Sequence, residues 1–246
     1  MHTETEICCF SLASAMVAHR LSTDRVELCG GYLEGGTTPS HGLIKLVLEN
    51  IVPKTFIMIR PRGGDFCYSE SEVQTIDNEI FQIKALNPGG FVFGALNSDG
   101  SVNEALCKKV IAWASPFPVT FHRAFDQCPD PMVALETLID LGFERILTSG
   151  QKESALLGLD LLKELVRTAD GRIQIMAGSG VNADNVSTFL DAGLPAVHFT
   201  AKEWQKSRMA VAGKVNMQAG VLPDDMGSYE TSEEVAEKLM NELFKC

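Results

Sequence analysis

The chain alternates short apolar segments with helix-type segments eight times along its 246 residues. By residue number, the expected strands are 6–10, 25–29, 56–60, 91–96, 118–121, 145–149, 172–176 and 196–200. A stretch whose apolar residues recur at helical spacing follows each strand, and this strict alternation predicts a parallel sheet. Eight such units in a chain of roughly 250 residues predict a closed (β/α)8 barrel, an α/β fold of the TIM-barrel type.

A doubly wound open sheet is the alternative for the same alternation. It is disfavoured because Gly178-Ser179-Gly180 lacks the third glycine of a dinucleotide-binding loop. No linker or low-complexity segment interrupts the pattern, so we expect a single barrel domain over residues 1–246. Residues from about 205 to 230 fit neither pattern and are expected to form an irregular segment before the last helix.

The composition limits the cell compartment and the classes of partner that we expect for this protein. A net charge of −11 argues against a nucleic-acid or anionic-membrane partner. No apolar run approaches the ~20 residues of a membrane span, and the N-terminal residues lack the features of a signal peptide. The 7 cysteines have no paired spacing, which argues against a disulfide framework. We therefore expect a cytoplasmic protein with free thiols, no nucleic-acid partner and no membrane partner.

Alternation along each strand predicts which side chains enter the barrel. In the second strand Val26 and Leu28 should face the helices, so the residues that alternate with them point inward. The polar and thiol residues predicted inward by this parity, near the carboxyl ends of the strands, are Glu6, Cys8, Glu27, Cys29, Arg60, His122, Gln174 and His198. Branched aliphatic residues ordinarily fill a barrel, and unpaired buried charges are costly. This set must therefore be mutually paired, hydrated or kept for a ligand.

Three strand ends carry residues suited to an anion. Arg60 and Arg62 are two residues apart and point to the same side of an extended chain. His122 and Arg123 end the fifth expected strand. The glycine-rich loop after the seventh lies where many barrels bind phosphate through backbone amides. The sequence thus predicts a small anionic ligand at the barrel mouth, with these binding candidates: Glu6, Arg60, Arg62, Asp65, Arg123, Ser149, Gly178, Ser179, Gly180 and His198.

Each of these features also has a purely structural interpretation. Glu27 with Arg60 would form a buried ion pair that fills space, and a single histidine is often a hydrogen-bonded core residue. Cys8 and Cys29 would be small buried hydrophobic residues, and the glycine-rich loop would be a tight turn. Taken jointly, the polar residues gathered at one mouth favour a ligand site.

Two strings in particular resemble the CutC copper-homeostasis proteins: Arg-Pro-Arg-Gly-Gly-Asp at residues 60–65 and Phe-His-Arg-Ala-Phe-Asp at residues 121–126. The likeness runs from about residue 6 to residue 204 and includes residues 24–29, 34–40, 147–150 and 176–181. The resemblance implies a cytoplasmic (β/α)8 barrel linked to copper tolerance, usually a homo-oligomer (dimer or tetramer). It also implies copper(I) binding at Cys8 and Cys29. Soft thiolates select Cu(I), and we expect the two sulfurs to lie close enough to share one two-coordinate ion.

The sequence therefore leaves two functions open. The first is a copper homeostasis protein that binds Cu(I) through Cys8 and Cys29. The second is an enzyme acting on a small anionic or phosphorylated metabolite, with His122 and either Glu27 or Asp126 as candidate catalytic acid–base groups. The cysteines distinguish the two, because copper binding needs both thiols and the enzyme needs neither.

Overall fold

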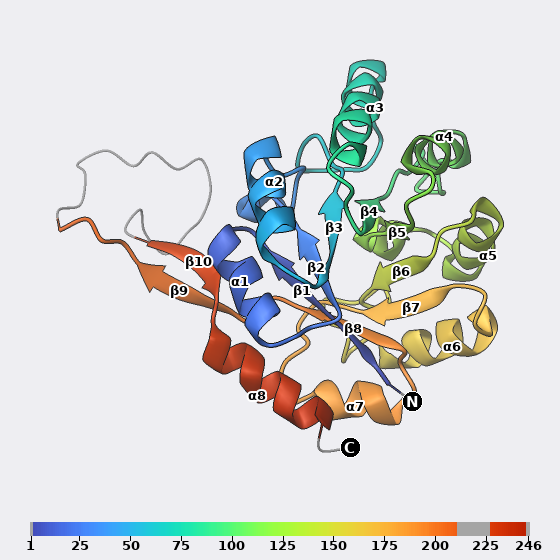
Figure 1. Ribbon diagram of the computed structural model, residues 1–246. Coiled ribbons are helices and arrows are strands. Elements are labelled where there is room, and N and C mark those ends of the chain that lie inside the picture. Colours follow the sequence, from blue (N-terminus) through green and yellow to red (C-terminus); the bar gives the residue numbers. More distant parts are fainter. Residues whose placement is uncertain (1, 211–226, 245–246) are drawn as a thin grey trace.

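The computed structural model describes residues 2–210 and 227–244. Its centre is a closed barrel of parallel strands in the order β1 to β8, in which β8 also pairs with β1 (Figure 1). The strands are β1 Glu4–Cys9, β2 Arg25–Leu28, β3 Lys54–Met58, β4 Gly90–Phe93, β5 Val119–Phe121, β6 Arg145–Thr148, β7 Gln174–Ala177 and β8 Ala196–Phe199. The (β/α)8 barrel predicted from the sequence is confirmed.

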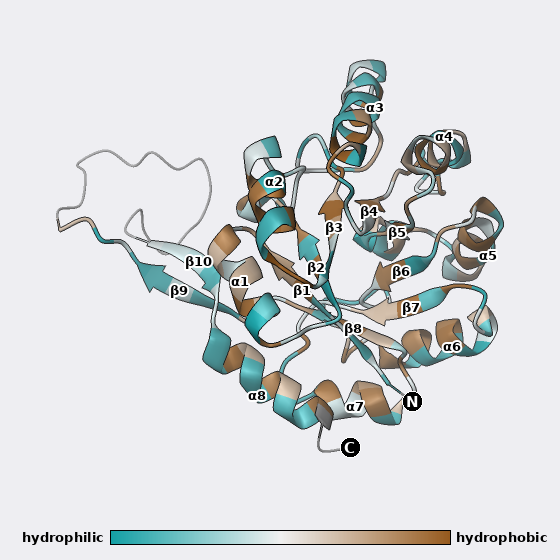
Figure 2. Cartoon of the chain, in the orientation of Figure 1, coloured by the Kyte–Doolittle hydropathy of each residue, from teal (hydrophilic) through white to brown (hydrophobic). Residues whose placement is uncertain are grey.

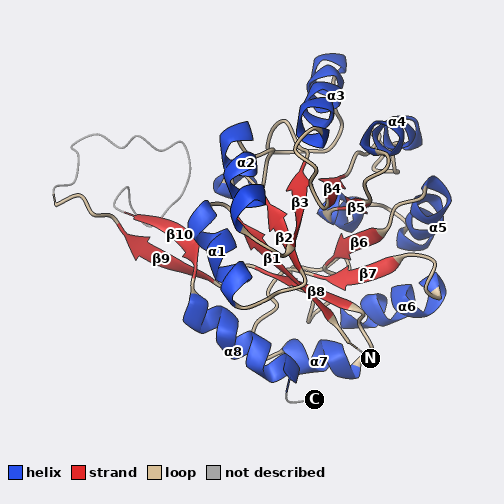
Figure 3. Cartoon of the chain, viewed as in Figure 1, coloured by secondary structure: helices blue, strands red, loops and turns tan. Residues whose placement is uncertain are grey.

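The helices lie outside the ring of strands (Figure 3). They are α1 Leu12–Arg20, α2 His41–Asn50, α3 Glu70–Lys84, α4 Glu104–Ala114, α5 Pro131–Leu141, α6 Leu159–Ala169, α7 Val186–Asp191 and α8 Glu233–Phe244. Short 3-10 helices, η1 Tyr32–Glu34 and η2 Arg123–Gln127, follow β2 and β5. Among the described residues, no helix combines the length and the apolar character that crossing a lipid bilayer requires.

Alternate residues of one strand belong to different clusters. In β1 and β2, Ile7 and Leu28 pack in the large cluster between strands and helices, whereas Cys8 lies in a separate cluster inside the barrel with Cys29, Phe56, Met58 and Val92. Figure 2 shows both hydrophobic and hydrophilic positions on the barrel strands and on the helices, and a largely hydrophilic β9. The period-2 pattern of the strands thus sorts side chains between the two sides of the sheet.

Buried ion pairs fill part of the barrel interior. Arg25 Nε donates to Glu6 Oε2 at 2.8 Å, and the Arg25 guanidinium stacks 3.3 Å from the centre of the Phe56 ring. Arg145, on β6, reaches across to Glu4 of β1 and contacts the Met176 sulfur at 3.3 Å. The first pair joins the neighbouring strands β1 and β2, and the second joins β1 to β6 across the barrel.

The segment expected to be irregular contains two paired strands. Lys202–Lys206 (β9) and Gly227–Thr231 (β10) form an antiparallel pair that projects beside α1 (Figure 1). Within this segment, residues 211–226 lie outside the described residues. The expectation was wrong for the flanking strands because β9 is largely exposed and carries no apolar alternation. Glu230 accepts hydrogen bonds from Ser11 and Ser14, which anchors the pair to the start of α1.

Candidate functional site

A cavity of about 530 Å³ opens at the carboxyl ends of the barrel strands. We call it the mouth cavity. The residues predicted from the sequence that line it are Cys8, Glu27, Arg60, His122, Arg123, Ser179, Gly180 and His198. Its lining combines the Cys8 thiol and the Glu27 carboxylate with cationic side chains such as Arg60 and Arg123.

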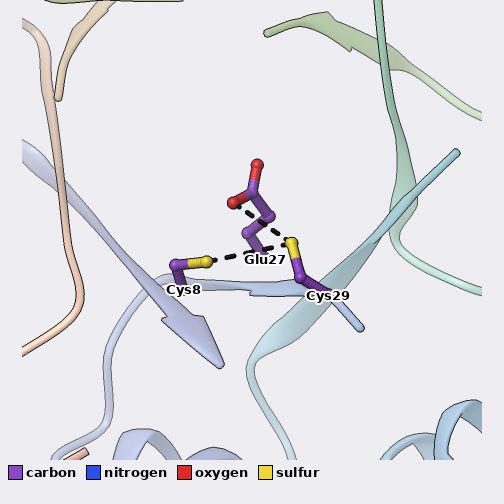
Figure 4. A group of neighbouring side chains, drawn as sticks. All are labelled: Cys8, Glu27 and Cys29. Atoms are coloured by element: carbon purple, nitrogen blue, oxygen red, sulfur yellow. Dashed lines mark hydrogen bonds between the residues drawn. The ribbon is translucent and has the colours of Figure 1, made fainter. Parts of the chain in front are cut away.

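The two thiols come from neighbouring strands. Cys8 is paired in register with Glu27 of β2, so Cys29, two residues beyond Glu27, lies next to it at the carboxyl end of the sheet. The Cys8 and Cys29 sulfurs are 3.8 Å apart, and the Cys29 sulfur is 3.6 Å from Glu27 Oε2 (Figure 4). All three side chains are buried. The structure thus brings together the two cysteines that the sequence resemblance singled out.

A histidine lies between two carboxylates beside these thiols. His198 Nδ1 is 3.0 Å from Glu6 Oε1, and His198 Nε2 is 3.7 Å from Glu27 Oε2. Burial works against the charged imidazole, but the Glu27 charge and the hydrogen bonds with Cys8 and Glu6 together outweigh it, and the pKa of His198 is raised well above its usual value. Burial likewise works against ionised Glu6, but Arg25 and His198 lower its pKa to about 2. His198 is therefore an imidazolium that bridges Glu6 and Glu27.

Both thiols of the pair hold their protons at neutral pH. The hydrogen bond that Cys8 donates to Cys29, together with burial, raises the pKa of Cys8 well above its usual range. For Cys29 the same hydrogen bond acts to lower the pKa, but burial and the Glu27 charge outweigh it and the pKa is about 12. A metal ion that binds here as a thiolate complex must displace these protons.

The donor atoms suit a soft or borderline metal ion. Metal–thiolate bonds of about 2.3 Å allow one ion to contact two sulfurs that are up to about 4.6 Å apart. The observed 3.8 Å lies within that limit and corresponds to a bent sulfur–metal–sulfur angle of about 110°. The ligand atoms of Cys8, Glu27 and Cys29 all lie within 4.8 Å of one another. Glu27 Oε1 is buried with no hydrogen-bond partner, so this oxygen is available to a cation.

Arg60 is a buried cation that follows β3, the strand next to β2, and lines the same cavity. Its guanidinium donates to the backbone carbonyls of Glu34 at 2.8 Å, Gly36 at 2.9 Å and Gly64 at 2.7 Å, while Nε is buried without a partner among the described residues. The Glu27–Arg60 ion pair considered from the sequence is not formed. Within residues 2–210 and 227–244, Arg60 pairs with no carboxylate.

His122 is neutral and has one unused donor. Burial and the Arg60 charge lower the pKa of His122 to about 3. Its Nδ1 accepts a hydrogen bond from the Ala124 amide at 3.1 Å, so the single ring proton of the neutral imidazole is on Nε2. That N–H is buried and has no acceptor among the described residues. Gly94 makes room for the ring, because a Cβ there would lie 2.5 Å from it.

Seven predicted site residues do not line the mouth cavity. Arg62 pairs with Glu72 and with Asp65, at 3.0 Å from the latter, and so holds the loop after β3. Asp126 accepts hydrogen bonds from the Ser149 amide and hydroxyl, both at 3.0 Å, and thereby fixes the end of β6. The seven residues are Glu6, Cys29, Arg62, Asp65, Asp126, Ser149 and Gly178.

The backbone amides of the loop after β7 fall into two groups, one hydrogen-bonded to β6 and the other without an acceptor among the described residues. The Gly178 amide donates to the Thr148 carbonyl at 3.0 Å and continues the strand pairing. Ser179 and Gly180 have positive φ values of 80° and 74°. Neither of their amides donates to any group in the described parts of the chain. Both residues line the mouth cavity.

Sequence reasoning missed Lys202, which also lines the mouth cavity. Its ammonium hydrogen-bonds to the Tyr32 hydroxyl and lies 5.1 Å from the Tyr32 ring centre and 5.0 Å from that of Tyr229. Nothing in the sequence pattern could reveal this position, because it depends on the pairing of β9 with β10.

We expect the stability of the fold to fall in acid because of Glu6, which pairs with Arg25 and His198. Because the folded pKa of about 2 lies below the usual 4.5, the stabilisation is complete above pH 4.5 and is lost as the pH falls through 2. This pKa shift corresponds to a decrease in the free energy of unfolding on the order of 3 kcal/mol. Urea unfolding between pH 5 and pH 2 should therefore show a steeper loss for the wild-type protein than for Glu6→Gln. Equal slopes for the two proteins would contradict the assignment.

Comparisons with known proteins agree on one family. The model of the CutC family matches residues 3–203, which contain β1 to β8. A Mus musculus protein named copper homeostasis protein cutC homolog is 48% identical over 205 residues, covering 83% of this chain and 75% of its own. A Photorhabdus laumondii protein named as a family protein CutC is 44% identical over 229 residues, covering 92% of each chain. The crystal structure of a CutC protein from Streptococcus agalactiae matches with a TM-score of 0.77 and 32% identity, covering 80% of this chain and 98% of that one.

Proposed function

This chain belongs to the CutC family, and from that premise we propose that it is a copper homeostasis protein that binds Cu(I) through Cys8 and Cys29. One observation carries the proposal: two buried sulfurs lie 3.8 Å apart, and one of them belongs to Cys8, which lines the mouth cavity. Thiolates are the protein ligands that select Cu(I). In this proposal copper is the cargo of the protein.

The charges around the thiols support a bound monovalent cation. Two thiolates with one Cu(I) carry one net negative charge, and the neighbouring His198 imidazolium offsets it. Glu27, whose Oε1 has no partner, offers a further oxygen to the ion. The bent angle set by the sulfur separation leaves a side of the ion open to such a donor. Cys8 and Cys29 are therefore the principal ligands, and Glu27 is an additional donor.

An anaerobic titration of Cu(I) against a competing chelator tests the proposal. We expect the wild-type protein to bind one Cu(I) per chain. Cys29→Ser should weaken binding by at least about 100-fold, because loss of even an outer-shell partner of a metal ligand costs about 10- to 100-fold.

Cys67→Ser is the matched control, because Cys67 is an exposed cysteine outside the mouth cavity. It should bind copper as the wild-type protein does. Unchanged binding by Cys29→Ser, with its melting temperature preserved, would refute the proposal. Loss of Cu(I) binding by Cys67→Ser would also refute it.

A further inference from the structure

Copper binding leaves several groups that line the mouth cavity without a role. These groups, here called the donor set, are Arg60, His122, Lys202 and the backbone amides of Ser179 and Gly180. We propose that the donor set binds a small phosphomonoester that carries a carbonyl or carboxylate oxygen at its other end. This ligand site goes beyond the copper function and does not depend on it.

The first argument comes from buried donors that have no acceptor. Arg60 is 6% exposed and His122 is 4% exposed, and both line the cavity. Each has a buried N–H without a partner, on Nε of Arg60 and on Nε2 of His122. Buried donors are nearly always satisfied in folded proteins, so an exception at a cavity wall calls for an acceptor from a ligand. The ligand must therefore present oxygen atoms to this wall.

The second argument is the sign of the charge. Arg60 and Lys202 form no ion pair with a carboxylate in the described part of the chain. Lys202 instead lies over two tyrosine rings, and Arg60 lies 4.8 Å from the centre of the Phe66 ring. The chain as a whole carries a net charge of −11, so two uncompensated cations at one cavity are a local feature. They favour an anion.

The third argument is the arrangement of the donors around the barrel. Arg60 follows β3 and the amides of Ser179 and Gly180 follow β7, which lies four strands away in an eight-stranded ring. Lys202 begins β9, just after β8, and its ammonium hydrogen-bonds to Tyr32 of η1, which follows β2. A ligand that uses both Arg60 and the amides after β7 must span the mouth and carry acceptors at both ends.

The two ends differ in what they can hold. Backbone amides in a left-handed turn suit the several oxygens of a phosphate. The neutral His122 Nε2–H beside Arg60 suits a single carbonyl or a carboxylate, because it donates without adding charge. A cavity of about 530 Å³ is large enough for a small metabolite of this class. We therefore assign the phosphate to the β7 side and the second oxygen group to Arg60 and His122.

Calorimetric titration of the metal-free protein with phosphoglycolate, inorganic phosphate and glycolate tests both ends. Phosphoglycolate should bind more tightly than either fragment. Lys202→Ala should weaken phosphate and phosphoglycolate about five- to tenfold, the range of a charge-assisted contact. His122→Asn, whose amide oxygen can still accept from the Ala124 N–H, should weaken phosphoglycolate and leave phosphate unchanged.

Lys206→Ala is the control for Lys202, because it removes the same charge from the same strand, outside the cavity. It should bind all three compounds as the wild-type protein does. Retained binding by Cys29→Ser would support the independence of this site from copper. The proposal fails if phosphoglycolate does not bind at millimolar concentration, or if Lys206→Ala weakens it as much as Lys202→Ala. Neither result would bear on the Cu(I) titration.

Discussion

The Arg25→Met variant is expected to have a free energy of unfolding about 3–5 kcal/mol smaller than that of the wild-type protein, the cost of breaking a buried ion pair on one side. Arg25 is the only ion-pair partner of Glu6, among the described residues, that cannot lose its charge near neutral pH. Methionine keeps the apolar stem against Phe56 but leaves the Glu6 carboxylate, fully buried, with His198 alone. The hydrogen bond from Arg25 to Thr120, of 3.0 Å, is lost as well.

Urea unfolding followed by circular dichroism measures this difference, and the chain contains a matched control. Arg20 also pairs with a glutamate, Glu233, at 2.8 Å, but the two side chains are 48% and 46% exposed. Arg20→Met should therefore change the free energy of unfolding by less than about 1 kcal/mol. If Arg25→Met cost no more than Arg20→Met, the Arg25–Glu6 pair would not be the stabilising contact described above.

The repeated strand–helix units of the barrel could be predicted from the sequence. A strand buried on its two faces still alternates between two environments, and Glu27 between Val26 and Leu28 records that alternation directly. The barrel follows from this pattern because eight strand–helix units close in only one common way. The likeness around Cys8 and Cys29 could be tied to two adjacent strands for the same reason, and the structure places these sulfurs 3.8 Å apart.

Partner choice across the barrel was not accessible from the sequence. Arg145 has the same inward parity as Leu147, yet its carboxylate partner, Glu4 on β1, depends on the diameter and stagger of the closed sheet. The partner of Arg25 is instead local, because Arg25 is paired in register with Glu6 on the neighbouring strand. Arg62 shows the reverse case. Its spacing from Arg60 predicts that both face one side, but the chain turns after Pro61 and Arg62 pairs with Glu72 of α3 instead. The alternation of side chains predicts their direction along a strand, but it does not predict their direction in the loop that follows.

The second large effect is expected in the pH dependence of copper binding. The apparent affinity for Cu(I) should rise about 100-fold for each pH unit between pH 6 and pH 8, because binding as a dithiolate releases two protons. The pKa of Cys8 lies well above its usual range and that of Cys29 is about 12, so both thiols are protonated throughout this window. Each released proton contributes a factor of ten per pH unit.

Chelator competition at several pH values, corrected for the protonation of the chelator, measures the slope. Cys67→Ser should keep the 100-fold slope, and Cys29→Ser should show weak residual binding with a slope near tenfold, because one thiol remains. A His198→Gln variant separates the two thiols further. His198 acts to lower the pKa of Cys8, so its removal should weaken Cu(I) at neutral pH while leaving a two-proton slope. A pH-independent affinity would show that copper binds without displacing the thiol protons, and the dithiolate site would then be wrong.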